Sequence, residues 1–105
     1  MRLEYENEKE MKRQAIGIFA KYLDISRYKV FIFGSRASGK GDERSDIDIG
    51  IQGLQKIPLE AMAKIREEIE ELPILYKIDV VDFTDASEQF KQVALKSVEH
   101  ISIAP

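Results

Sequence analysis

The chain has 105 residues, which the usual length prior assigns to one domain, so we expect residues 1–105 to fold as a single unit. Hydrophobic residues make up 44% and charged residues 33% of it, a balance that excludes an intrinsically disordered chain. Lys and Arg number 16 against 19 Asp and Glu, and this net charge of −3 argues against a protein that coats nucleic-acid phosphates.

Neither a secretion signal nor a membrane span is expected. The start, MRLEYENEKE, holds no apolar stretch that could serve as a signal peptide, and no apolar run approaches the roughly 20 residues that cross a bilayer. The sequence has no cysteine, which excludes disulfide and thiolate chemistry and fits a reducing compartment. We therefore expect a cytoplasmic protein with no membrane partner.

The first third of the chain predicts a helix, a strand and a glycine-rich loop. Apolar residues at helical spacing predict an amphipathic helix over 8–23, and YKVFIF at 28–33 predicts a strand buried on both faces that stops at Gly34. The segment GSRASGKGDERS at 34–45 is rich in glycine and ionic side chains, so a loop follows. The expected buried face of the helix consists of Met11, Ala15, Ile18, Phe19 and Tyr22.

A second strand and a second helix come next. Residues 46–52, DIDIGIQ, alternate strictly, which places the three isoleucines on one face and Asp46, Asp48 and Gly50 on the other. Pro58 suits the first turn of a helix that runs to Pro73. The expected buried stripe of that helix consists of Leu59, Met62, Ile65, Ile69 and Leu72.

The C-terminal part predicts a third strand over 77–83, KIDVVDF, and a last helix. Asp85 with Glu88 three residues later resembles a capping box at the start of this helix. His100 falls on the same helix, where we expect a surface or core-edge histidine. The expected apolar face consists of Phe90, Val93, Ala94, Val98 and Ile101.

These elements follow the order α-β-β-α-β-α, which predicts an α/β (α+β) fold with a small mixed β-sheet flanked by helices. The first two strands are separated by about ten loop residues and should run antiparallel. The third strand returns through a helix, so it can lie parallel to the second. Helices on both sides should bury the isoleucine faces.

The pair Asp46 and Asp48 is the first candidate for chemistry. Carboxylates at positions i and i+2 of a strand leave the same face, with Cβ atoms about 6 to 7 Å apart. Carboxylates so close repel each other unless a cation lies between them. Hard oxygen ligands at this spacing suit Mg²⁺ or Mn²⁺, which complete their shells with water and substrate phosphate.

The loop before this pair is suited to an anion. Gly34 and Ser35 end a buried strand and let backbone N–H groups and a hydroxyl approach phosphate, while Arg36, Lys40 and Arg44 add positive charge. The same loop also matches the first seven positions of the Walker A pattern, which would make the chain a P-loop-like ATP binder. Position 41 is Gly instead of Ser or Thr, and no helical run follows, so this is a minor alternative.

A third carboxylate is needed if two metal ions about 3.5 to 4 Å apart are to be held. The strand at 77–83 offers Asp79 and Asp82, which are three residues apart and so face opposite sides of the sheet. Asp79 lies in mid-strand, and Asp82 could instead be a structural acceptor for a turn or loop. Strand parity alone does not choose between them.

The segments GSRASGKGDERSDIDIGI and KIDVVDF together resemble the signature of the minimal nucleotidyltransferases in the DNA polymerase β-like superfamily. That signature is a Gly-Ser, about ten residues, an Asp-x-Asp and a third aspartate on a later strand, and the resemblance extends across nearly the whole chain. It implies that Gly34 and Ser35 hold the nucleotide phosphates and that Asp46 and Asp48 bind metal ions. It selects Asp79 as the third ligand and makes Arg36 a triphosphate contact.

This resemblance implies one nucleotidyltransferase domain of the polymerase β-like fold. The expected substrate is ATP or another NTP, and the expected cofactor is a pair of Mg²⁺ or Mn²⁺ ions. The product would be an acceptor that carries a nucleoside monophosphate such as AMP. Minimal nucleotidyltransferases commonly pair with a small helical HEPN protein as the antitoxin of a toxin–antitoxin system, which makes a HEPN-type partner, a hetero-oligomer or a homodimer expected. The alternative from another class is a toxin-binding module of the same fold without catalysis.

Overall fold

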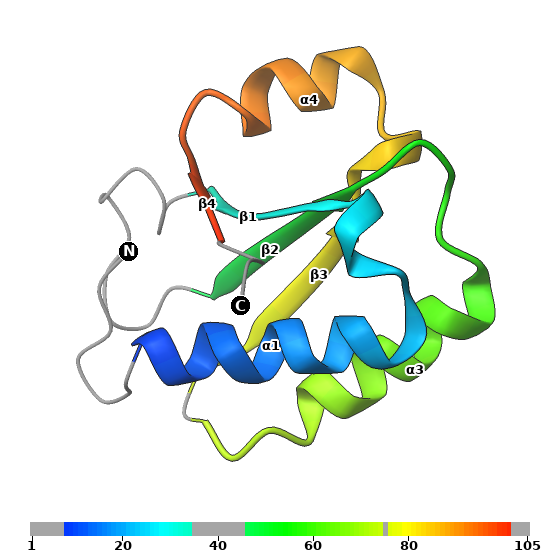
Figure 1. Cartoon of the computed structure of the whole chain (residues 1–105). Coiled ribbons are helices and arrows are strands. Elements are labelled where there is room, and N and C mark those ends of the chain that lie inside the picture. The colour runs from blue at the N-terminus through cyan, green and yellow to red at the C-terminus, as the bar shows by residue number, and fades with distance from the viewer. Residues whose placement is uncertain (1–7, 35–45, 75, 102–105) are drawn as a thin grey trace.

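The computed structural model describes residues 8–34, 46–74 and 76–101, in which a mixed β-sheet carries helices on both faces (Figure 1). Two helices, α1 and α3, cover one face, and the short helix α4 lies across the other (Figure 1). The elements are α1 (Glu8–Tyr22), η1 (Ile25–Arg27), β1 (Lys29–Phe33), β2 (Ile47–Gln52), α3 (Leu59–Glu70), β3 (Ile78–Asp82), η2 (Phe83–Asp85), α4 (Glu88–Ala94) and β4 (Val98–His100).

The strands of the described residues lie in the order β3-β2-β1-β4. β1 is antiparallel to β2, and β2 is parallel to β3, as the lengths of the connections predict. The mixed α/β fold class expected from the sequence is therefore confirmed.

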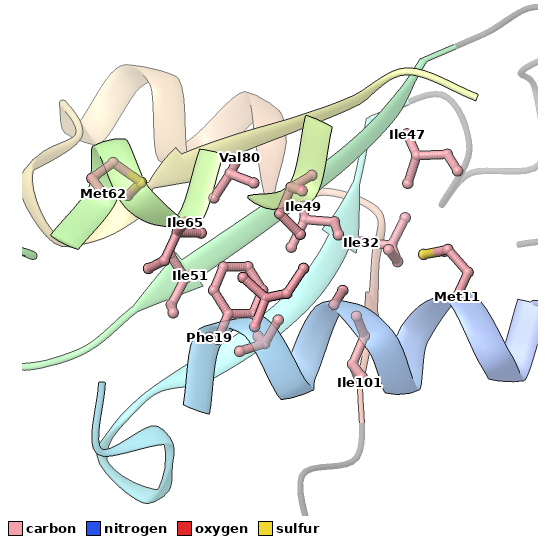
Figure 2. Close-up of a cluster of buried hydrophobic side chains, with 14 of the residues drawn as sticks. Met11, Phe19, Ile32, Ile47, Ile49, Ile51, Met62, Ile65, Val80 and Ile101 are labelled. Atoms are coloured by element: carbon pink, nitrogen blue, oxygen red, sulfur yellow. The ribbon is translucent and has the colours of Figure 1, made fainter. Parts of the chain in front are cut away.

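The main core lies between the sheet and the helices α1 and α3 (Figure 2). Ile47, Ile49 and Ile51 on β2 are completely buried, as their strict alternation predicts. Burying each such side chain contributes about 1.5 to 3 kcal/mol. α1 and α3 supply the opposing side chains at helical spacing: Met11, Ala15, Ile18, Phe19, Met62, Ile65 and Ile69.

The opposite face of the sheet has a smaller aromatic core of Phe31, Phe33 and Phe83, covered by α4. Gly50 makes room for this core, because a Cβ atom at that position would stand 2.3 Å from the Phe31 ring. The face of β2 that carries Gly50 also carries Asp48. The aromatic core and this aspartate therefore share one side of the sheet.

The end of the chain differs from the sequence expectation. The last helix stops at Ala94, and Val98–His100 forms β4, which pairs antiparallel with β1. The backbone N–H of Ile101 extends this pairing to the carbonyl of Val30 at 2.9 Å. The predicted order thus lacks a fourth strand, because a strand that short is stabilised by a distant partner and carries no periodicity of its own. His100 is exposed, as expected, but on a strand.

The predicted starts of the last two helices also need correction. The cap of α4 is Ser87, whose hydroxyl accepts a hydrogen bond from the Phe90 N–H at 3.1 Å, whereas Asp85 belongs to η2. Pro58 lies at the N-cap of α3 and not within its first turn. Leu59, expected in the buried stripe, is the first residue of α3 and is 79% exposed. Every helix in the described ranges is too short or too polar to span a bilayer.

Candidate active site

Two carboxylates face each other across the parallel strands β2 and β3. Asp48 and Asp79 are direct register partners, so their side chains leave the same face of the sheet from adjacent strands. The Ile47 N–H donates to the Lys77 carbonyl at 2.8 Å and fixes this alignment where both strands begin. Asp46 precedes β2 and is exposed.

The electrostatics of Asp48 reflect these neighbours. Partial burial raises the pKa of the Asp48 carboxyl above its ordinary value, and the carboxylates of Asp79 and Asp46 raise it further. Each of these causes disfavours negative charge on Asp48. A cation placed between the carboxylates would relieve the repulsion.

Gly34 adjoins the Asp48 carboxylate. It directly follows β1 and has a φ of +76°, and a Cβ atom there would stand 2.7 Å from Oδ2 of Asp48. Any other residue would therefore be strained in the backbone and would collide with the carboxylate. The predicted phosphate contacts Ser35 and Arg36, with Lys40 and Arg44, lie outside the described residues.

Asp82 lies on the other face of β3 and has a structural role. Its carboxylate accepts hydrogen bonds from the backbone N–H groups of Ile57 and Thr84, each at 2.9 Å. The Thr84 hydroxyl in turn accepts from the Gly53 N–H at 3.0 Å. These bonds hold the connection after β2 against the end of β3. Of the two aspartates that parity left open, Asp79 is therefore the one that lies beside Asp48.

The carboxylates open into a pocket of about 690 Å³ that runs along the edge strand β3, a size typical of small-ligand sites. Lys77 approaches Asp79 with its Nζ 3.9 Å from Oδ1; the Lys77 side chain is largely exposed and that of Asp79 about half exposed. The sequence analysis did not single out Lys77, although its position two residues before Asp79 was an available signal. The lining includes Phe33, Asp48, Arg66, Lys77, Asp79 and Phe90.

The donor set fits a hard divalent cation. Asp48 and Asp79 offer carboxylate oxygens from adjacent strands, the ligand type that Mg²⁺ and Mn²⁺ prefer. Within the described ranges, no three His, Asp or Glu side chains are grouped closely enough to hold an ion by themselves. An ion at this pair would complete its shell with water and substrate phosphate, as Mg²⁺ does in phosphate-handling sites.

Comparison with known proteins assigns this arrangement to a family. The sequence pattern of the polymerase beta nucleotidyltransferase family matches residues 13–103, nearly the whole chain. The chain belongs to this family. The resemblance to minimal nucleotidyltransferases is thus confirmed, and the chain is a nucleotidyltransferase enzyme rather than a P-loop-like ATP binder.

Relatives and solved structures agree with this assignment. The probable protein adenylyltransferase MntA of Haemophilus influenzae is 27% identical over 89 residues, which cover 83% of this chain and 78% of that protein. A chain in the crystal structure of a toxin–antitoxin with AMP-PNP gives a TM-score of 0.67 at 19% identity, covering 85% of this chain and 70% of that one. A chain in a complex of tri-AMPylated Shewanella oneidensis HEPN toxin with MNT antitoxin gives 0.67 at 16% identity, covering 90% and 71%. At these identities the solved structures show the shared nucleotidyltransferase fold.

Proposed function

We propose that this nucleotidyltransferase uses divalent metal ions to transfer AMP from ATP to a hydroxyl group of a HEPN-type partner protein. The observation that carries the proposal is the placement of Asp48 beside Asp79 on the sheet face that opens into the pocket. The pocket also receives a positive side chain, Lys77, next to the carboxylates. Charge of both signs at one open site suits a metal–triphosphate complex.

Asp46, Asp48 and Asp79 are the proposed ligands of two Mg²⁺ or Mn²⁺ ions. Gly34, Ser35 and Arg36 are the proposed contacts of the triphosphate, and the missing Cβ at Gly34 leaves space for a phosphate beside Asp48. When bound, the ions would neutralise charge on the triphosphate and on the attacking oxygen. The protein's own contribution is to position the reactants and to hold fixed charges around them.

The transfer itself needs an acceptor hydroxyl in line with the α-phosphorus of ATP. A bond forms from the hydroxyl oxygen to this phosphorus, the bond to the β-phosphate oxygen breaks, the hydroxyl proton is released and pyrophosphate leaves. Asp79 lies on the edge strand β3, whereas Asp48 lies on β2 in the interior of the sheet. We therefore expect Asp79 to affect the chemical step more than nucleotide binding.

The partner is proposed from the relatives. MntA is named a protein adenylyltransferase, and the similar chain from Shewanella oneidensis is in complex with an AMPylated HEPN toxin. By analogy, this chain would act as the antitoxin, in the cytoplasm, and would assemble with its HEPN partner. Exposed apolar side chains on and after α4, such as Val93 and Leu95, are available for such an interface.

The test is transfer of labelled AMP. The chain is incubated with α-labelled ATP, Mg²⁺ and the HEPN-type protein encoded beside it, and label on the partner is the expected result. Asp48→Asn and Asp79→Asn should abolish labelling, whereas Asp82→Asn should retain it as far as the variant stays folded. Full activity of Asp79→Asn with loss of activity in Asp82→Asn would overturn the site assignment.

The same experiment tests the second candidate function. A non-catalytic module that neutralises a toxin by contact alone would form a tight complex with the partner and leave it unlabelled. Labelling that requires Mg²⁺ and Asp48 excludes that alternative.

A further inference from the structure

Phe90 is a large aromatic side chain that remains 43% exposed at the candidate site. It lies on α4, over the sheet face that carries Asp48 and Asp79, and it lines the same pocket as both carboxylates. An exposed aromatic ring that lines a pocket offers apolar surface to a bound ligand. Phe90 is therefore accessible to a ligand in this pocket.

The Phe90 ring packs against buried aromatic rings of the sheet face beneath α4. Its centroid lies 5.3 Å from that of Phe83 at an interplanar angle of 39°, and 6.5 Å from that of Phe33 at 82°. The ring centroids of Phe83 and Phe33 lie 4.9 Å apart, and both side chains are almost completely buried. The hydrogen bond from the Phe90 N–H to Ser87 also fixes the backbone at this position. The exposed ring is thus held in place.

A continuous path of side chains connects this ring to the carboxylates. Phe33 is the direct cross-strand partner of Asp48, so the two side chains are neighbours on one face of the sheet. Phe90, on α4, packs in turn against Phe33 on this face of the sheet. A nucleotide whose phosphates lie at Asp48 and Asp79 would therefore have aromatic surface available for its base.

We propose that Phe90 is the surface on which the nucleobase of the bound triphosphate stacks. This inference rests on the proposed function, since it assumes that the triphosphate binds at Asp48 and Asp79. Aromatic side chains bind nucleobases by stacking, and the π-face is common to all bases. The rings around Phe90 carry no hydrogen-bonding groups, so this surface favours purines over pyrimidines through their larger stacking area.

The experiment measures the affinity of the full chain for Mg²⁺ complexes of ATP, CTP and inorganic tripolyphosphate by calorimetry. Phe90→Ala should weaken ATP binding about 5- to 150-fold, with a smaller loss for CTP. Tripolyphosphate has no base, so its affinity should not change. Phe90→Tyr should retain ATP binding, and Phe90→Leu, which keeps apolar bulk at α4, should lose it as Phe90→Ala does. Gln92→Ala is the matched control, because Gln92 is exposed on the same helix and does not line the pocket.

Three outcomes would overturn the inference. The first is that wild-type protein binds both ATP and tripolyphosphate, and that Phe90→Ala and Phe90→Leu do not change the ATP affinity. This result refutes the stacking role and leaves the proposed function intact. Equal losses for ATP and tripolyphosphate would mean that Phe90 shapes the pocket instead of contacting the base. If wild-type protein binds neither ligand, the proposed function itself fails.

Discussion

Replacing Asp48 by asparagine should stabilise the metal-free protein, although it removes a proposed metal ligand. In the wild-type protein, burial and the nearby carboxylates of Asp79 and Asp46 all act against the charge on Asp48. Asparagine has nearly the same shape and no charge, so it removes this repulsion without leaving a cavity. Sites built to bind a cation commonly carry such a cost to stability when the cation is absent.

The size of the effect follows from the spacing of the strands. Side chains of register partners on adjacent strands place two carboxylates about 6 Å apart, where Coulomb's law gives about 0.7 kcal/mol in water and about 3 kcal/mol at an effective dielectric constant of 20. Asp79 is about half exposed and is paired with Lys77, so solvent and this cation reduce the repulsion. We expect a gain of about 1 kcal/mol, which raises the Tm of a domain of this size by about 4 to 8 °C.

The assay is thermal unfolding in EDTA at low ionic strength, followed by circular dichroism. Adding Mg²⁺ should raise the Tm of wild-type protein and leave that of Asp48→Asn nearly unchanged. Asp82→Asn is the control with opposite sign, because it weakens two hydrogen bonds to backbone N–H groups and should cost about 1 to 2 kcal/mol. A Tm of Asp48→Asn at or below that of wild-type protein in EDTA would refute the reasoning.

Three further predictions concern the same face of the sheet. The pKa of Asp48 is raised above its ordinary 3.8, so ionisation of this carboxyl destabilises the folded state. The higher Tm of Asp48→Asn should therefore be fully present at neutral pH and should diminish as the pH falls through the raised pKa toward 3.8. A Tm difference that does not depend on pH would contradict this. Gly50→Ala should lower the free energy of unfolding, measured in urea, by about 1 to 3 kcal/mol or more, because the added Cβ would overlap the Phe31 ring. A variant as stable as wild-type protein would show that this ring has room to move. Lys77→Gln should tighten Mn²⁺ binding to the nucleotide-free protein roughly two- to fivefold, since the Lys77 ammonium group competes with the metal for Asp79. The Tm should change little. Weaker Mn²⁺ binding by the variant would contradict this prediction.

The main elements could be predicted because their signals are local. The helical spacing of apolar residues located α1 to within one residue of its end, and the alternation of isoleucines identified the buried face of β2. With the isoleucines on the core face, Asp48 had to lie on the opposite side of the strand. The acidic face was therefore predictable before any contact between strands was known.

The end of the chain was not predictable in this way. Val98 and Ile101 fit a helical face, yet Val98–His100 pairs with β1 as β4. A three-residue strand derives its stability from hydrogen bonds to a partner about 70 residues away in the sequence, and such a partner leaves no local pattern. Leu59 fits the helical stripe equally well, yet it is exposed at the first residue of α3.

The sequence by itself determined the inventory of the site: a glycine at the end of the first strand, two aspartates on one face of the second and two further candidates on the third. The tertiary structure decided which of those candidates lies beside Asp48. The parallel register aligns Asp79 with Asp48, while Asp82 turns to the other face and binds backbone N–H groups. Side-chain alternation belongs to each strand alone, but register is set by packing and hydrogen bonds between strands, so it is decided only when the sheet assembles.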